Sequence, residues 1–443
     1  MLLHCDSSRS IIHYFVDLYE EKSLENLWQQ CQKTLSCEQL ENNIDTDVAI
    51  VGAGFTGLST ALHLAKLGVN VTVVEAQEVG YGASGRNVGL TNAGLWIMPS
   101  ETERLLGSQQ GRELNQLLID APKYVHQLIQ EQQLDCDLMT NGTLHLAHSK
   151  SALSYLKDRQ AQLTEYGAQI EYLDQQQTFA KSQAEGYHGA LMDLNAGTVQ
   201  PLKYCLALAR LAQQQGVKIY QKSGITQIEK KADKFVLNSA KGQIKANKVV
   251  LATNAYEQYL NNNNKLFTPL YFCQLASEPL SKEQREHCLP DNNGCWDSGA
   301  VMRSFRTDSA GRLIVGTVGN IHTNGAKAFK QWSEHVVKNT FPKIGKLEYS
   351  YGWSGCIAKS HNNIPQVLEL EKNIVQVVGY SGRGIAGGTV VGRELANYLN
   401  GNISQAQLAL PVNKAKNISF NQVRAAVYEI GCQLSHISDH LIR

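Results

Sequence analysis

Apolar runs of two kinds alternate in the segment that begins near residue 47. Val48–Val51 and Val69–Glu75 are almost continuously apolar, and Phe55–Lys66 between them carries apolar residues at helical spacing. A short continuous apolar run bounded by turn residues is typical of a strand covered on both faces. A helix between two such strands joins them in parallel, so the pattern predicts one β-α-β unit.

Similar runs recur later in the chain. A helix that ends at Gly216 and leads into a strand is predicted for PLKYCLALARLAQQQGVKIY. A buried strand is predicted for ANKVVLATNAY. A strand, a glycine-rich turn and a helix are predicted for NIVQVVGYSGRGIAGGTVVGRELANYL. Between these blocks helices mix with short strands, and SFRTDSAGRLIVGTVG carries the turn of a β-hairpin. We therefore expect an α/β protein with a discontinuous nucleotide-binding domain (46–100, 194–260 and 350–402) and a second α+β domain of mixed or antiparallel sheet (101–193 and 266–349).

Both ends of the chain lie outside this pattern. Residues 1–45 predict a partly helical extension that packs on the outside of the nucleotide-binding domain, with one apolar face. Residues 403–443 predict a tail with an amphipathic helix, whose apolar stripe we expect to dock on its own protein. The apolar positions are Leu24, Leu27, Trp28 and Cys31 in the first segment, and Val423, Val427, Ile430, Leu434, Ile437 and Leu441 in the second.

Composition narrows the partner and the compartment. The chain has 443 residues with 41 Lys+Arg against 40 Asp+Glu, so no charge excess favours nucleic acid or an anionic membrane. The ten cysteines show no metal-type or redox-type pairing, and the first residues lack the pattern of a secretory signal. We expect free thiols, a small-molecule partner, no membrane association and a cytoplasmic location, and the oligomeric state stays open.

Gly52, Gly54 and Gly57 form the motif G-x-G-x-x-G between the first strand and the first helix. The first glycine permits the tight turn, the second lets a pyrophosphate approach the backbone, and the third lets helix and strand pack closely. The helix start at Phe55 and Thr56 then offers free N–H groups to phosphate. Glu75, followed by Ala76, ends the next strand and can accept hydrogen bonds from a ribose, which favours an adenine dinucleotide without a 2′-phosphate.

A second loop, GYGASGRNVGLTNAG, identifies the nucleotide. The order of motifs resembles that of the D-amino acid oxidase superfamily of FAD-dependent oxidoreductases. The motifs are G-x-G-x-x-G, then an acid, then the GASGRN stretch with Gly82, Ala83, Ser84, Arg86 and Asn87. Two later stretches are similar to the γ-glutamylputrescine oxidase branch of this superfamily. They are YGWSGCIAKSHNNIPQVLELEKNIVQVVGYSGRGIAGGTVVGRELANYLNG and SFRTDSAGRLIVGT. The resemblance covers roughly residues 45–402 and implies a glutathione reductase-type, Rossmann-like FAD-binding domain beside a substrate domain.

The resemblance also implies how the cofactor lies. The GASGRN loop would follow the pyrophosphate and ribityl chain of a non-covalently bound FAD, although Cys356 lies near a position where relatives attach flavin covalently. A helix starting near Gly387 would direct its positive end at the pyrimidine side of the flavin ring, where reduction places negative charge. The remaining implied cofactor contacts are Gly224, Ile225, Thr253, Asn254, Ser381, Gly382, Arg383, Gly384 and Ile385.

The implied reaction is oxidation of the C–N bond of an amine or amino acid to an imine, by hydride transfer to flavin N5, followed by hydrolysis. Such chemistry needs orientation more than acid or base catalysis, and a bidentate Arg is the usual ligand of a substrate carboxylate. We take Arg303, Arg306 and Arg383 as candidates for that task, and Lys359 as a candidate for promoting reaction with oxygen. The candidate pocket walls are Trp96, Tyr256, Tyr271, Trp353 and Tyr380.

Several alternatives stay open at this stage. The substrate could be a γ-glutamylputrescine-like amine or a secondary amino acid, since Ser304 and Val88 depart from the branch's pattern. The chain could instead be a D-amino acid dehydrogenase that passes electrons to a quinone rather than to O2. An NAD-binding protein or a flavin-binding domain without catalysis is a third reading. His145 and His148 stand at odd spacing on a predicted strand, so we predict no metal site.

Overall fold

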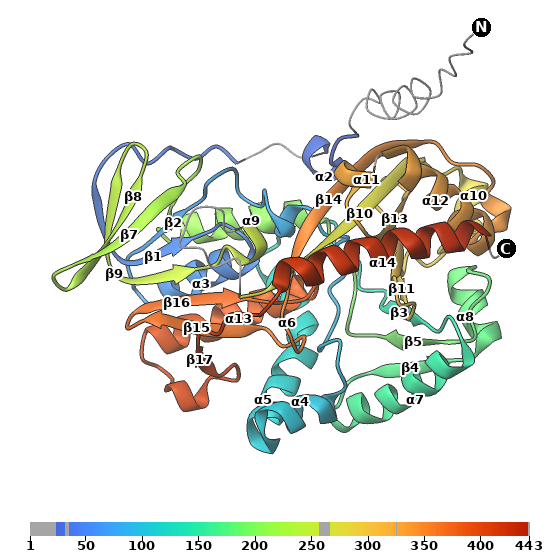
Figure 1. The fold of residues 1–443 in the computed structure, drawn as a ribbon, viewed down its shortest axis with the longest axis horizontal. Coiled ribbons are helices and arrows are strands. Elements are labelled where there is room, and N and C mark those ends of the chain that lie inside the picture. Colours follow the sequence, from blue (N-terminus) through green and yellow to red (C-terminus); the bar gives the residue numbers. More distant parts are fainter. Residues whose placement is uncertain (1–23, 32–34, 257–265, 325, 442–443) are drawn as a thin grey trace, which may run out of the picture.

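The computed structural model describes residues 24–31, 35–256, 266–324 and 326–441, with two sheets side by side (Figure 1). The first sheet has nine strands, and its central strand β1 (Ile44–Val51) pairs in parallel with β2 (Val71–Val74) and with β9 (Gln243–Leu251). The expected β-α-β unit is therefore present. The other strands of this sheet are β6 (Lys218–Tyr220), β7 (Ile225–Lys231), β8 (Lys234–Ser239), β15 (Gln366–Glu371), β16 (Ile374–Val378) and β17 (Val412–Lys414).

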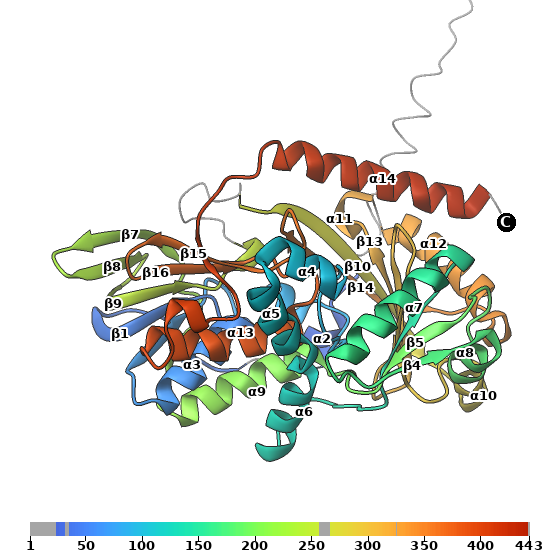
Figure 2. The same cartoon turned by 90° about the horizontal axis from the view of Figure 1, so that it is seen from below.

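Three helices cover one face of this sheet (Figure 2): α3 (Phe55–Lys66), α9 (Pro201–Gln214) and α13 (Gly384–Leu399). Helix α3 has the predicted bounds, because Gly54 ends the strand-to-helix turn and Gly68, at φ +80°, follows the last helical turn. Leu58, Ala61 and Leu62 of α3 are completely buried in the resulting core. Burial on this scale fixes the helix start against the carboxyl end of β1.

The second sheet has eight strands in the order β14 (Tyr349–Lys359), β10 (Thr268–Pro279), β13 (Arg312–Val318), β12 (Arg303–Thr307), β11 (Gly294–Asp297), β3 (Thr143–Leu146), β5 (Ala190–Asp193) and β4 (Ile170–Leu173). Only the pair β11 and β3 is parallel within this sheet as described, so it is mixed. The expected hairpin is β12 and β13. The α/β fold with a second, mixed sheet is confirmed.

The remaining helices surround the two sheets. They are α4 (Pro99–Leu106), α5 (Ser108–Ile119), α6 (Ala121–Glu131), α7 (Lys150–Glu165), α8 (Gln175–Ser182), α10 (Lys282–Glu286), α11 (Ile321–Asn324) and α12 (Ala326–Thr340). Helices α5 and α6 pack against α13 and share the core of the first sheet, through Leu114, Leu118 and Val125. The structure thus places part of the expected substrate segment 101–193 on the first domain. It also places β14, expected in the first domain, in the second sheet.

The N-terminal extension contains one short described helix, α2 (Leu27–Gln30). Two residues of its expected apolar face, Leu27 and Trp28, are buried against α9 and β14, where the two sheets meet. The Trp28 indole N–H donates to the Asn87 carbonyl at 3.0 Å, and its ring meets Trp353 edge-on with centroids 5.6 Å apart. Residues 1–23 of the extension lie outside the described residues.

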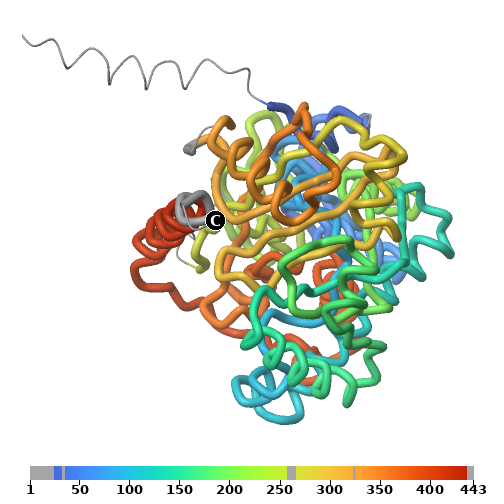
Figure 3. The backbone as a smooth tube through the Cα atoms, turned by 90° about the vertical axis from the view of Figure 1, so that its right-hand side faces the viewer, coloured from blue at the N-terminus to red at the C-terminus, as the bar shows by residue number. Residues whose placement is uncertain are grey.

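The C-terminal helix α14 (Asn421–Leu441) lies across the surface of the second sheet (Figures 1 and 3). Here the expectation that the apolar stripe docks on the protein is wrong for Val423, Val427, Ile430 and Leu434, which face outward. The side chains of the other two stripe positions, Ile437 and Leu441, lie outside the described residues. Within the described residues, no helix is long and apolar enough to cross a membrane.

Candidate functional site

One cavity of about 510 Å³ lies where the two sheets meet. Its walls come from segments far apart in the chain: the turn between β1 and α3, the end of β2, the loop 80–88, the end of β9, strands β10 and β14, and the turn 380–386. The starts of α3 and α13 both line this cavity, α3 through Gly54 and Phe55 and α13 through Gly384 and Ile385. The early and late glycine-rich motifs therefore serve the same site.

The glycines of the first motif are required by close backbone contacts. Gly52 has φ +107°, and a Cβ at this position would lie 2.9 Å from the Ala252 carbonyl oxygen. A Cβ on Gly57 would lie 2.1 Å from the Gly52 oxygen, and one on Gly54 would lie 2.8 Å from Ser84 Oγ. Gly52 and Gly54 line the cavity together with Phe55 and Thr56, whereas Gly57 does not, so its role is to let helix and turn pack.

Glu75 stands at the end of β2 and faces the cavity beside Ala76, Gly224 and Ile225. Its carboxylate accepts the N–H of Ala53 at 2.9 Å and that of Gln77 at 3.0 Å. Burial raises the pKa of the Glu75 carboxyl, and these N–H groups oppose the rise. The carboxylate therefore braces the glycine-rich turn and still has lone pairs to offer a hydroxyl group in the cavity.

The loop 80–88 follows the cavity wall and includes the cavity-lining Gly82 and Ala83. Ser84 Oγ accepts the N–H of Phe55 at 3.1 Å, which ties the loop to the start of α3. Arg86 donates to the carbonyls of Tyr81 at 2.8 Å and Ser354 at 3.3 Å. Asn87 donates to the carbonyls of Ala83 and Ser84. Arg86 and Asn87 thus hold the loop in place as well as lining the cavity.

The turn 380–386 forms another part of the cavity wall, next to the start of α3. Helix α13 begins at Gly384, three residues before the expected start near Gly387, so its first N–H groups lie at the cavity wall. Ser381 has φ +53° and Gly382 has φ +94°, which makes the turn sharp. The Tyr380 hydroxyl lies 2.8 Å from Thr56 Oγ1 at the start of α3. This contact links the two helix starts directly.

These features fit a bound FAD. Glycines leave the backbone open along the wall, two helix starts supply N–H groups for anionic oxygens, and Glu75 can receive ribose hydroxyls. Thr253 Oγ1, which is buried at the cavity beside Asn254, has no hydrogen-bond partner among the described residues. An orphaned buried hydroxyl is costly unless a ligand completes its bonding, so the wall is incomplete without one.

Arg383 occupies the part of the cavity formed by the second sheet. Its guanidinium carbon lies 4.6 Å from the ring centroid of Trp96 and 4.9 Å from that of Trp296. Nη1 donates to the Ala93 carbonyl, whereas Nε and Nη2 have no hydrogen-bond partner in the described chain. Burial, reinforced by the nearby Arg159 charge, lowers the pKa of Arg383 to about 9. The group is therefore a buried cation with two unused donors.

Arg303 and Arg306, expected as substrate ligands, do not line the cavity. Arg306 is fully buried under Trp28 and donates to the carbonyls of Val88 at 3.0 Å and Val199 at 2.7 Å. The backbone N–H of Arg303 donates to the Asp297 carboxylate at 3.0 Å. Arg306 therefore joins the hairpin β12–β13 to the cofactor loop, a structural role that its strand position alone does not reveal.

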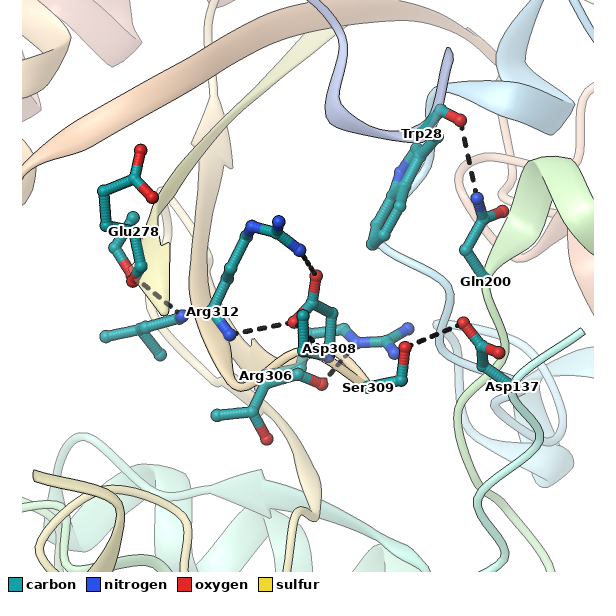
Figure 4. A network of polar contacts seen from close by, with 12 residues as sticks. Trp28, Asp137, Gln200, Glu278, Arg306, Asp308, Ser309 and Arg312 are labelled. Atoms are coloured by element: carbon teal, nitrogen blue, oxygen red, sulfur yellow. Dashed lines mark hydrogen bonds and ion pairs between the residues drawn. The ribbon is translucent and has the colours of Figure 1, made fainter. Parts of the chain in front are cut away.

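The network around Arg306 joins the parts of the chain that frame the site (Figure 4). Asp308 pairs with Arg312 at 3.0 Å, and the neighbouring Ser309 hydroxyl donates to the Asp137 carboxylate at 3.0 Å. Gln200, at the start of α9, donates to the Trp28 carbonyl at 3.5 Å. These contacts tie the hairpin turn to the loop at Asp137 and tie the start of α9 to α2.

Other predicted residues are divided between the cavity and the core. Lys359 lines the cavity and donates to Asn363 Oδ1 at 2.5 Å, and burial lowers the pKa of its ammonium group. Trp96, Tyr256 and Tyr380 also line the cavity, whereas Trp353 packs on Trp28 and Tyr271 is 39% exposed. Lining residues that the sequence did not single out include Phe272, Gln274, Trp296 and Met302.

Residues 47–398 match the protein family described as DAO, FAD dependent oxidoreductase. The gamma-glutamylputrescine oxidoreductase of Escherichia coli (strain K12) is 29% identical over 406 residues, which cover 89% of this chain and 94% of that protein. Glycine oxidase of Bacillus licheniformis is 24% identical over 375 residues, which cover 80% of this chain and 93% of that protein.

Solved structures share the fold. Glycine oxidase from Geobacillus kaustophilus superposes with a TM-score of 0.67 at 19% identity, covering 81% of this chain and 96% of that one. L-Proline dehydrogenase from P. horikoshii also reaches 0.67, at 16% identity, covering 83% and 96% of the two chains. The resemblance seen in the sequence, and the FAD it implies, are confirmed. Because the family match spans most of its length, the chain belongs to the DAO family of FAD dependent oxidoreductases.

Proposed function

We propose that the chain oxidises the C–N bond of an amine or amino acid that carries a carboxylate, such as a γ-glutamylputrescine-like amine or a secondary amino acid. The observation that carries the proposal is the position of Arg383, a buried cation with two unused donors at the cavity wall. Glu75, placed at the glycine-rich turn, is the sole Asp or Glu among the described lining residues. A cavity wall with a buried cation, and with its one carboxylate at the glycine-rich turn, favours an anionic group over a simple diamine.

Arg383 is suited to hold a carboxylate in a fixed orientation. A guanidinium can donate two parallel N–H bonds to the two oxygens of a carboxylate, and such bonds strengthen when water is excluded. The indoles of Trp96 and Trp296 lie against the guanidinium, which limits its movement and keeps water away. Fixing one end of the substrate places the carbon next to its nitrogen in one position, which is most of what this chemistry needs.

Two residues that line this part of the cavity carry oxygens without a partner within the described residues, Gln274 Oε1 and Ser304 Oγ, and a small shift of either covered side chain would present its oxygen to the substrate amine. Either oxygen can accept an N–H bond from a neutral amine. When bound, FAD supplies the group that accepts the hydride from the substrate carbon. The product imine leaves the cavity and water hydrolyses it to a carbonyl compound and an amine or ammonia.

The electron acceptor after this step is O2 or a quinone. Lys359 is a half-buried cation at the cavity wall, and a positive charge there stabilises negative charge that develops during reaction with O2. On this ground we favour the oxidase. A dehydrogenase that uses a quinone would reduce an artificial dye under air and produce little peroxide, so comparing the two rates separates the alternatives.

The test is an anaerobic screen of amines and of D- and L-amino acids with FAD-loaded protein, watching the visible flavin absorbance. We expect bleaching by carboxylated amines and little or none by the matched compounds that lack the carboxylate. Arg383→Met should raise KM for the active compound strongly. The matched control is Arg393→Met on α13, the helix that follows Arg383, because Arg393 stacks over Tyr124 at 4.4 Å and lies outside the cavity. Equal bleaching by both members of each pair would refute the carboxylate assignment.

A further inference from the structure

Helix α14 presents an apolar stripe to the outside of the molecule. Val423, Val427, Ile430 and Leu434 are 59%, 63%, 56% and 62% exposed, respectively. They follow one another at spacings of four, three and four residues, so they form one line along the helix. Large aliphatic side chains are rarely exposed to this degree in a continuous row, and such a row marks an interaction surface.

The opposite face of α14 is fixed to the protein by specific contacts. The Asn421 side chain donates to the Phe267 carbonyl at 3.1 Å, and Cys432 is buried. The His436 ring packs on Phe329 and Trp332, with centroids 5.5 and 5.1 Å apart. The helix lies on the outside of the molecule (Figure 3) and docks through a mostly polar face, which leaves the apolar stripe exposed.

The geometry of the stripe fits another helix better than a lipid surface. A row at alternating three- and four-residue spacing is the narrow seam of a helix pair, whereas a helix that lies in a membrane interface has a broad apolar face and a polar face rich in Lys and Arg. On α14 the polar face is already occupied by the protein. Only one of the described positions beside the stripe is basic. These positions are Arg424, Ala426, Gly431 and Gln433.

We propose that α14 pairs with α14 of a second copy of this chain to form a homodimer. Spacings of four, three and four residues read the same in both directions, so the row matches itself about a two-fold axis. Small Ala426 and Gly431 beside the row allow two helices to approach closely. Gly431 and Gln433 carry no charge, so they bring no like-charge repulsion to a symmetric pair.

Sedimentation velocity of the full-length, FAD-loaded protein over a wide range of concentration tests this proposal. We expect a monomer–dimer equilibrium for the wild type. Val427→Glu combined with Ile430→Glu should weaken it by about 30-fold or more, the usual effect of losing a central apolar anchor. Both side chains are exposed in the single chain, so the thermal midpoint and FAD content should be unchanged.

The matched control is Leu67→Glu combined with Leu105→Glu, which adds the same charge at sites 40% and 37% exposed, just after α3 and on α4. It should dimerise like the wild type. A wild type that stays monomeric at every concentration would overturn the proposal. This holds whether the stripe is then covered by another part of the chain or binds a lipid surface, which pelleting with phosphatidylcholine vesicles would detect. A stripe variant that dimerises as well as the wild type would overturn it too.

Discussion

Replacing Gly57 by Ala tests most sharply how the fold builds the cofactor site. The added Cβ would lie 2.1 Å from the Gly52 carbonyl oxygen and 3.3 Å from Ala252 Cβ. An ordinary carbon–oxygen contact is roughly 3.3 Å, so the turn and the start of α3 must separate by about 1 Å. The oxygen belongs to the backbone, so it cannot move aside as a flexible side chain would. The strain falls on the turn that receives the phosphates.

The expected magnitude follows from the cost of overpacking, which is about 1–3 kcal/mol for one added methyl group in a packed interior. Since every 1.4 kcal/mol is about a tenfold change in an equilibrium constant, FAD should bind about 5- to 150-fold more weakly if the cost falls on the bound state. The assay is a titration of apoprotein with FAD, following the change in flavin fluorescence, together with the thermal unfolding midpoint.

Gly387→Ala is the matched control for this experiment. A Cβ there would meet Leu118 at 3.6 Å and Tyr380 at 3.8 Å, both ordinary contacts, and Gly387 does not line the cavity. It should bind FAD like the wild type and gain a little stability from its helix position. If Gly57→Ala bound FAD with wild-type affinity and unfolded at the same temperature, the close-packing argument would be refuted.

Three further predictions concern stability. Arg306→Met should lower the free energy of unfolding by about 1.5–3 kcal/mol or more, because backbone carbonyls of the cofactor loop lose a charged donor; urea unfolding measures this, and exposed Arg104→Met should change little. Burial lowers the pKa of His63 to about 4, so between pH 6.5 and 4 the unfolded chain binds a proton that the folded chain does not. The free energy of unfolding should therefore fall as the pH drops through this range. In His63→Gln, the slope of the unfolding free energy against pH should be smaller by at most roughly 1.4 kcal/mol per pH unit. Ser84→Ala removes the acceptor of the Phe55 N–H and should cost about 1 kcal/mol in the apoprotein, measured by thermal unfolding; an unchanged midpoint would contradict the role of that contact.

The sequence predicted the local parts of the site well, because their geometry is set by neighbours in the chain. The glycines at 52, 54 and 57 can serve few purposes between a strand and a helix, and the bounds of α3 follow from Gly54 and Gly68. The late motif was placed on the cavity for the same reason. Its helix starts three residues earlier than expected, because glycines at 384, 387 and 388 are all compatible with a first helical turn.

The sequence could not show which arginine faces the cavity with free hydrogen-bond donors. Arg306 and Arg383 both stand in promising stretches, but only the packing of distant segments decides which one has free donors. Arg306 meets the carbonyls of Val88 and Val199, which lie more than a hundred residues away in sequence, whereas Arg383 packs against both Trp96 and Trp296. Nothing in the sequence marks Trp296 as a lining residue, since one aromatic in a short strand gives no sign of which face it occupies.

The orientation of α14 shows a second limit. Helical spacing reveals that an apolar stripe exists, and the usual expectation is that it faces the core. Here Asn421, Cys432 and His436 provide the docking contacts, and a moderately polar face can hold a helix when its groups find specific partners. Such partners become visible only once the surface beneath the helix is known.

The most direct measurement of the central claim is a titration of the FAD-loaded protein with a non-reactive carboxylate such as acetate or benzoate, following the visible flavin spectrum. A carboxylate held by Arg383 within the cofactor cavity should perturb the spectrum saturably in the wild type and in Arg393→Met, and bind far more weakly in Arg383→Met. The same affinity in all three proteins, or no perturbation at any concentration, would contradict a cavity in which one cation orients the substrate beside FAD.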